Sequence, residues 1–221
     1  MSHRGVFSTL LAFVAVLMLS AAAQESRPAT VAFNCDFPGS DPAHYGISVS
    51  SDGRSSYISD GKLTRDSDPS EPITVDFTMP QPTLAKIFDL TKKAHFFEGE
   101  IDSKKKNIAS TGEKTLSYKD EHKNTTATYN YSLVPAVQDL TTVFQNLSIT
   151  LEAGRRLEFD HRYQKLALDE ELKRMADLAT RNELGDVGVI AKILQAIADD
   201  SSVTNGARVR AQRLLASSPA K

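Results

Sequence analysis

The spacing Glu158-x-x-His161 is the fragment of this sequence that is most typical of metal chemistry. Residues three positions apart lie on one face of a helix, so this carboxylate and this imidazole could both reach one ion. Di-iron helical bundles use such a half-site twice, together with further carboxylates on facing helices. The sequence holds no second copy, and Arg155, Arg156 and Asp160 flank this one. We therefore expect a solvated charged patch on a helix rather than a metal site.

Two other acidic clusters could attract a divalent cation. The residues Asp120–His122 are consecutive in a predicted hairpin connection, and neighbouring side chains of an extended chain point in opposite directions. Asp66, Asp68 and Glu71 lie in a proline-containing loop that lacks the glycine and the spacing of a calcium loop. We predict a soluble turn at the first cluster, a solvated loop at the second, and a metal-ligating residue at neither.

The motifs of the common catalytic mechanisms are absent from the sequence. It has no G-x-S-x-G turn, no P-loop, no G-x-G-x-x-G, no H-E-x-x-H and no C-x-x-C. Asp160, His161 and a serine or Cys35 could be written as a triad, but such sets arise by chance in a chain of this composition. Cys35 is the only cysteine and lies between Phe33 and Phe37. We expect a buried free thiol there, with a bridge to another chain as the alternative, and we predict no catalytic residue and no cofactor.

The tyrosines form a further group with binding potential. Tyr129 and Tyr131 fall on one face of a predicted strand, and we expect Tyr57 and Tyr118 near them. An exposed group of this kind would form a binding surface. A buried group would be ordinary packing of a sheet against its covering helices, which is the interpretation we favour. The sequence leaves both open.

The first 23 residues have the pattern of an export signal. Arg4 supplies the positive start, Leu10–Leu19 is almost unbroken apolar sequence, and Ala21–Ala23 offers the small residues that a signal peptidase needs. The apolar run is shorter than the roughly 20 residues that span a bilayer, which disfavours a retained anchor. We predict an exported protein, periplasmic or extracellular, whose mature chain begins near Gln24.

Charge and length exclude some classes of partner. The chain has 221 residues and a formal net charge of −2. This near balance argues against nucleic acid and anionic membranes, because both select a basic face. The densest basic run, Lys104–Lys106, is expected to be a solvated loop. A chain of this length can bury a full hydrophobic core without a metal or a disulfide. We predict no nucleic-acid partner and no membrane span after signal removal.

Strand and turn patterns dominate residues 30–132. Alternation of apolar and polar side chains predicts five strands, which we place at Tyr45–Val49, Arg54–Ile58, Ile73–Met79, Thr115–Tyr118 and Thr125–Tyr131. Asp52-Gly53 is a two-residue hairpin signal between the first two. A helix with its apolar stripe over Leu84–Ala94 follows the third strand. Because strands and helices do not alternate, the order predicts an α+β fold with a small antiparallel sheet, packed by one or two helices.

The chain after residue 132 is helical in pattern. Apolar residues recur at three-to-four spacing from Leu133 to Leu151, and we expect this face to close the core over the sheet. Gly154 either ends this helix or is tolerated within a longer helix that runs toward Tyr163. The sequence leaves both alternatives open.

Three further helices are expected beyond that point. Asp169 and Asp186 are predicted to cap the first two, and the last spans about Ser202 to Ser217. They form a helical C-terminal region that follows the sheet. We therefore predict three segments, which are a signal peptide at 1–23, an α+β domain at 24–154, and a helical subdomain or arm at 155–221.

Part of the sequence resembles a bacterial domain of unknown function that is found in exported proteins. The resemblance lies in Tyr45-x-Ile47-x-Val49-x-x-Asp52-Gly53-x-x-x-Tyr57, in the Leu84–Ala94 helix and in Phe96-Phe97, and it covers residues 33–150. These are turn and core positions, so the resemblance assigns no catalytic residue. It implies a location in the cell envelope and a small α+β fold. Members often have two cysteines before the first strand, whereas this chain has only Cys35, so no local disulfide can form there.

These observations favour a non-catalytic exported protein that binds another protein or a component of the cell envelope. The sheet domain and the helical region are its expected surfaces. The alternative is an exported hydrolase or metal-dependent enzyme of an undescribed class, which would use Glu158, His161 or the acidic loops. A third hypothesis is an inhibitor or chaperone-like protein that covers a client. The sequence predicts neither the partner nor the oligomeric state.

Overall fold

The computed structural model describes residues 27–63, 72–105 and 107–217. The predicted signal peptide at 1–23 lies outside the described residues, and so do Asp66, Asp68 and Glu71 of the acidic loop. Within the described ranges, no helix has both the length and the apolar character that a membrane crossing would require.

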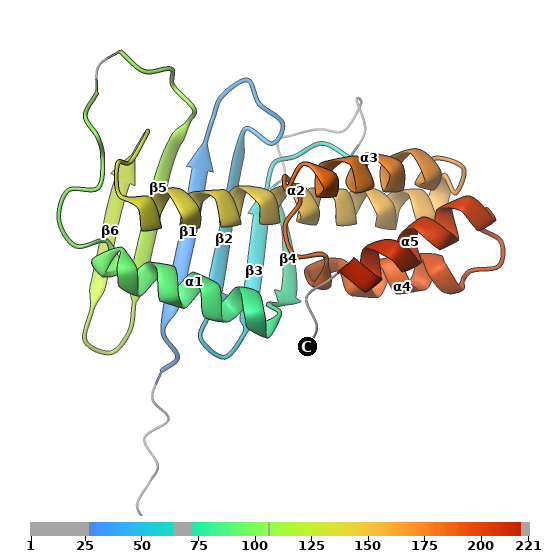
Figure 1. Ribbon diagram of the computed structural model, residues 1–221, viewed down its shortest axis with the longest axis horizontal. Helices are drawn as coiled ribbons and strands as arrows, with labels where there is room; N and C mark the ends of the chain where they lie inside the picture. Colours follow the sequence, from blue (N-terminus) through green and yellow to red (C-terminus); the bar gives the residue numbers. More distant parts are fainter. Residues whose placement is uncertain (1–26, 64–71, 106, 218–221) are drawn as a thin grey trace, which may run out of the picture.

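Six antiparallel strands form one sheet (Figure 1). The strands are β1 (Thr30–Asp36), β2 (His44–Ser50), β3 (Arg54–Ser59), β4 (Ile73–Thr78), β5 (Glu113–Lys119) and β6 (Asn124–Tyr129). Their order across the sheet is β4-β3-β2-β1-β5-β6, so β4 and β6 are the edges. Each neighbouring pair is antiparallel. The sheet is thus the antiparallel one that the strand order predicts.

Strand β1 is central to the sheet, yet the sequence analysis did not place a strand there. It pairs with β2 on one side and with β5 on the other. Val31, Phe33 and Cys35 alternate on it and are all buried. The alternation is short, and Asn34 and Asp36 interrupt it with residue types that are depleted in strands, so the local signal is weak. Its position between two neighbours, rather than its own propensity, makes it a strand.

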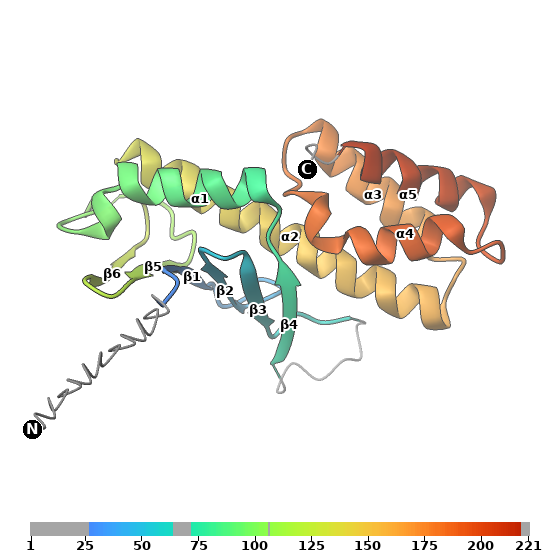
Figure 2. The ribbon, with the colours of Figure 1, turned by 90° about the horizontal axis from the view of Figure 1, so that it is seen from below.

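Two helices cover one face of the sheet (Figure 2). They are α1 (Gln81–Lys93), which ends in the short 3-10 turn η1 (His95–Phe97), and the long helix α2 (Pro135–Tyr163). The rings of Phe33 on β1 and Phe144 on α2 stack with their centroids 5.2 Å apart. Both side chains are fully buried, so the apolar face predicted for this helix closes the core of the sheet.

Helix α2 continues without a break through Gly154 to Tyr163. The longer of the two helices considered from the sequence is therefore the one that forms. A β-carbon on Gly154 would lie 2.4 Å from Ile190 Cγ2, so the missing side chain allows the segment at Ile190 to approach α2 closely. The boundary predicted at residue 154 lies within this helix. The N-terminal half of the helix packs on the sheet, and the C-terminal half packs against the helical region (Figure 1).

The helical region packs on the C-terminal half of α2, beyond edge strand β4 (Figure 1). It comprises α3 (Leu168–Thr180), the 3-10 turn η2 (Val187–Ile190), α4 (Ala191–Asp199) and α5 (Asn205–Ser217). Asp186 caps η2, because its side chain accepts a 2.9 Å hydrogen bond from the Gly188 amide. Asp169 is not the cap of α3 that we predicted. It lies inside the first turn of that helix and forms an ion pair with Arg210 of α5.

The architecture is therefore α+β, with a helical C-terminal region after an antiparallel sheet, as the sequence predicts. Leu157, Leu168 and Leu194 are fully buried where the helices of this region meet. Ion pairs also join them, since Glu171 of α3 binds Arg156 of α2 at 3.0 Å. The helical region is consequently fixed to the same helix that covers the sheet.

Candidate functional site

No helix of the described residues covers the face of the sheet opposite α1 and α2 (Figure 2). We call it the open face. Short hydroxyl and amide side chains predominate at its outward positions, namely Thr30, Asn34, Ser48, Ser50, Ser56, Thr74, Thr78, Thr115, Ser117, Asn124, Thr126 and Thr128. All of them are exposed or half-buried. Alternation explains the arrangement, because every second residue of a strand that packs against helices must face the other way.

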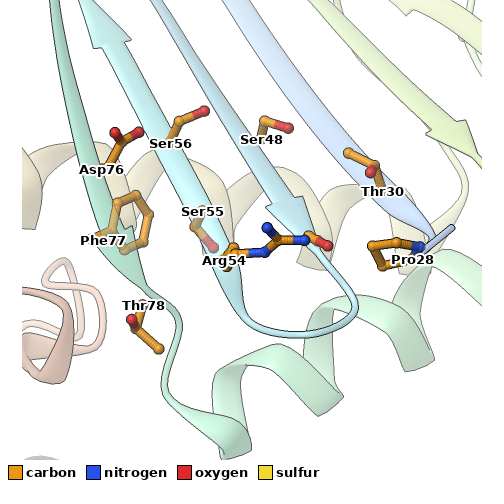
Figure 3. A pocket seen from close by; sticks show the side chains of 10 residues that line it. Pro28, Thr30, Ser48, Arg54, Ser55, Ser56, Asp76, Phe77 and Thr78 are labelled. Carbon is orange, nitrogen blue, oxygen red and sulfur yellow. The ribbon is translucent and has the colours of Figure 1, made fainter. Parts of the chain in front are cut away.

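A shallow hollow of about 700 Å³ lies on the open face, where strands β1 to β4 run side by side (Figure 3). Ser48 and Ser56 are direct cross-strand partners in its floor, and Thr30 and Asp76 extend it across β1 and β4. Phe77 adds apolar surface. We call this region the open-face hollow.

The open-face hollow contains one charge of each sign. The Arg54 guanidinium is 2.8 Å from the carboxylate of Asp52, which belongs to the β2–β3 turn, and its side chain is largely exposed. Asp76 on β4 is exposed and forms no ion pair with a described residue. Among the described residues, the carboxylate of Asp76 therefore has no ionic partner, whereas Arg54 is paired with Asp52.

The side chains that line the open-face hollow are mainly hydroxyl groups that can form hydrogen bonds. Its serine and threonine hydroxyls can each donate and accept. A serine nucleophile requires an adjacent base that a third group orients. Among the described residues that line it, there is no histidine and no lysine beside the serines. This arrangement is suited to binding a polar surface.

The structure does not bring Glu158 and His161 together at a metal site. His161 Nε2 lies 2.9 Å from Asp200 Oδ2, and Lys165 Nζ lies 2.6 Å from the same oxygen. Lys165, together with the Ser202 hydroxyl, holds the pKa of Asp200 well below its usual value. Glu158 is exposed beside β4. Across the part of the chain that the structure describes, no three His, Cys, Asp or Glu side chains are grouped as metal ligands.

The carboxylate of Asp120 accepts hydrogen bonds from residues within and beside its own turn. The Tyr118 hydroxyl donates to Asp120 Oδ2 at 2.7 Å, and the amides of His122 and Lys123 donate to Oδ1 at 2.7 and 2.6 Å. These bonds, the Tyr118 bond foremost, lower the pKa of Asp120 and keep it ionised. Asp120 thus stabilises the turn that connects β5 to β6.

The tyrosines divide between core and surface. Tyr57, Tyr118 and Tyr129 are buried under the helices, where they pack as ordinary core residues. Tyr131 follows the end of β6 and is 42 % exposed, so the four do not form one aromatic surface. Cys35 is a free, buried thiol.

Sequence reasoning missed three groups with functional interest. Glu152 is buried in α2, where it binds Arg155 at 2.8 Å, although it follows directly after the predicted apolar face. Lys114 is buried on β5, at a strand position that alternates with the outward ones. The open face was also missed, although the repeated Ser and Thr at alternating strand positions could have indicated it.

Comparison with family models and with curated proteins identifies no relative of this chain, since no protein-family model matches it and no curated protein matches it in sequence. The resemblance of residues 33–150 to a domain of exported proteins therefore stays a prediction. What supports a function is the geometry of the open face.

Proposed function

We propose that this protein is an exported, non-catalytic binding module that recognises a partner protein through the open face of its sheet. The observation that carries the proposal is that short hydroxyl and amide side chains predominate at the outward positions of all six strands, on the face that no described helix covers. A soluble antiparallel sheet often has one solvated face, which by itself indicates no ligand. The hollow of about 700 Å³ and its two charges give this face a shaped and chemically distinct region.

A polypeptide partner suits this face better than a glycan of the envelope. Sugar-binding surfaces commonly stack pyranose rings on aromatic side chains, which combine apolar faces with polar edges. Phe77 is the one aromatic side chain among the described residues that line the hollow, and the whole chain has no tryptophan. Hydroxyls and amides across a flat surface instead match the donors and acceptors of a polypeptide. Asp76 and Arg54 would then fix the orientation of the partner by charge.

The export signal predicted at 1–23 would deliver the protein to the periplasm or the exterior, where the partner would be met. Detection of the mature chain in periplasmic or culture fractions, with an N-terminus near Gln24, would test this part of the proposal.

The binding proposal is tested by retention of envelope proteins on the immobilised mature chain. We expect the double substitution Ser48→Arg/Ser56→Arg to abolish retention of the partner, because two long cations would fill the centre of the hollow. The matched control is Thr115→Arg/Thr128→Arg, which changes another cross-strand pair at the far end of the same face. Both variants place their new side chains in solvent, so circular dichroism and thermal melting should match the unmodified protein.

The outcomes of this experiment are separable. A protein that is retained by the unmodified chain and by the control, but lost with Ser48→Arg/Ser56→Arg, supports binding at the open-face hollow. Loss with both variants would extend the site over the whole open face. Equal retention by all three proteins would refute the open face as the binding surface.

A further inference from the structure

A second cleft lies at the other end of the sheet, between the end of β6 and the first turns of α2. Its volume is about 380 Å³. The lining consists of hydroxyl and amide side chains, two tyrosine rings and a single charged group, Lys114. No aspartate or glutamate of the described ranges lines it. We call it the Lys114 cleft, and it is separate from the open-face hollow.

Lys114 is a buried cation with neutral partners. Its side chain belongs to a residue that is only 3 % exposed. The ammonium donates to Thr111 O and Thr111 Oγ1 at 2.9 Å, to Gly112 O at 3.0 Å and to Asn130 O at 3.1 Å. These oxygens satisfy its protons but bring no negative charge. Within the described ranges, the Lys114 ammonium contacts only neutral oxygens, and burial lowers its pKa.

The cross-strand neighbour of Lys114 supplies no counter-charge either. Cys35 on β1 faces Lys114 on β5 in the register of the sheet. Burial raises the pKa of the Cys35 thiol, so it is neutral at physiological pH. A buried charge is costly unless an opposite charge compensates it. The described residues thus place no carboxylate beside this cation, and the adjoining cleft is where a counter-ion could enter.

The N-terminus of α2 adds positive potential to the same cleft. The aligned peptide dipoles of a helix concentrate partial positive charge at its first turn. Helix α2 has 29 residues, no acidic side chain in its first turn and no side-chain cap. Ser132 and Gln138, which flank that first turn, line the Lys114 cleft. The positive end of α2 therefore lies beside the cleft that contains the Lys114 side chain.

We propose that the Lys114 cleft binds a small organic anion. Its oxyanion group, a carboxylate or a phosphate, would lie near Lys114 and the start of α2, and its body would pack against the exposed ring of Tyr131. The side-chain amide of Gln145 lines the cleft and makes no hydrogen bond to a described residue, so it can donate to the ligand. Clefts of this volume commonly hold small ligands. This inference does not depend on the proposed binding of a protein at the open face.

The proposal is tested with defined probes and the mature protein. Thermal melting and isothermal titration at constant ionic strength would compare benzoate, phenyl phosphate and inorganic phosphate with benzyl alcohol, which has a similar ring but no charge. We expect saturable binding and a concentration-dependent rise in Tm for benzoate or phenyl phosphate, and none for benzyl alcohol. The two aromatic anions identify which oxyanion is preferred, and inorganic phosphate reveals whether the organic body contributes.

Two variants keep the test decisive. Gln145→Glu places a carboxylate within the cleft, so we expect probe binding to weaken at least about tenfold. The matched control is Gln212→Glu, which makes the same change on the exposed face of α5 and should bind the probes normally. Lys114→Met should also abolish binding, but Gln145→Glu keeps the test valid if that variant does not fold. The proposal is overturned if no anionic probe binds saturably, or if Gln145→Glu binds as well as the unmodified protein.

Discussion

The hydroxyl of Tyr57 donates a 2.9 Å hydrogen bond to Oε1 of Glu152, and thereby joins strand β3 to helix α2 across the core. Both residues are buried, and 95 positions separate them in the sequence. Arg155 completes the group by binding both carboxylate oxygens, at 2.9 and 2.8 Å, and the Gly61 carbonyl at 3.2 Å. Burial, and then the charge of Glu152, raise the pKa of Tyr57. The hydroxyl therefore stays a proton donor to this carboxylate.

Removal of the buried carboxylate should be strongly destabilising. Glu152→Ala would leave the Arg155 guanidinium without its counter-ion, and we expect a loss of about 3–5 kcal/mol in the free energy of unfolding. Tyr57→Phe removes one donor and should cost about 1–3 kcal/mol. Urea denaturation measures both. The control Glu158→Ala, which changes an exposed glutamate of the same helix, should stay within about 0.5 kcal/mol of the unmodified protein. Equal effects of Glu152→Ala and Glu158→Ala would contradict this account.

Gly154→Ala should destabilise the protein although it improves helix propensity. Alanine is favoured over glycine in a helix by about 1 kcal/mol. The new β-carbon, however, would lie 2.4 Å from Ile190 Cγ2, and overpacking of this kind costs about 1–3 kcal/mol. A double-mutant cycle with Ile190→Ala measures the coupling by urea denaturation. The cost of Gly154→Ala should fall when Ile190 is truncated, whereas an unchanged cost would show that the two residues are not in contact.

Stability should fall in acid as Glu171 is protonated. Burial opposes ionisation, but bonds from Arg174 and Arg156 outweigh it, so the folded-state pKa of Glu171 lies below the unfolded value. The pairing therefore stabilises the protein above the unfolded pKa, near pH 4.5, and this contribution is lost as the pH falls through the folded pKa. Glu171→Gln should make the decline of Tm between neutral pH and about pH 3 shallower. Glu170→Gln, its exposed neighbour, is the control and should leave the pH profile unchanged.

The Cys35 thiol should react slowly in the native protein. It is buried, and burial raises its pKa, so both access and the thiolate fraction are low. We expect iodoacetamide to leave Cys35 unmodified under native conditions and to alkylate it fully in urea, as measured by mass spectrometry. Rapid native alkylation would show that the core around β1 opens easily.

Local patterns of the sequence predicted most of the elements correctly. Alternation identified β2 to β6, and three-to-four spacing identified α1 and α2, because a buried face imposes those periods on the residues that form it. Strand β1 was missed because Asn34 and Asp36 weaken its pattern, while pairing with two neighbours stabilises it. The continuity of α2 at Gly154 depends on the contact with Ile190, which no local pattern contains.

The candidate sites could be predicted less well than the fold. Glu158 and His161 have a suggestive spacing, but His161 pairs with Asp200, which is 39 positions away. The open face depends on which side of the sheet the helices cover, and outward serines and threonines have the same pattern whether they bind a partner or only water. The burial of Lys114 could not be predicted either, because it results from tertiary packing and not from the local strand pattern.

Protection of a single thiol on the open face tests the central claim most directly. Thr78→Cys places an accessible thiol in the open-face hollow, and Gln212→Cys places one on exposed helix α5 as the control, while Cys35 remains buried. Alkylation of each variant would be timed with and without a saturating amount of the retained partner protein. Binding at the open face predicts that the partner slows modification at position 78 by at least about tenfold and leaves position 212 unchanged. Protection at position 212 with none at position 78 would contradict it and would place the binding surface on the helical region.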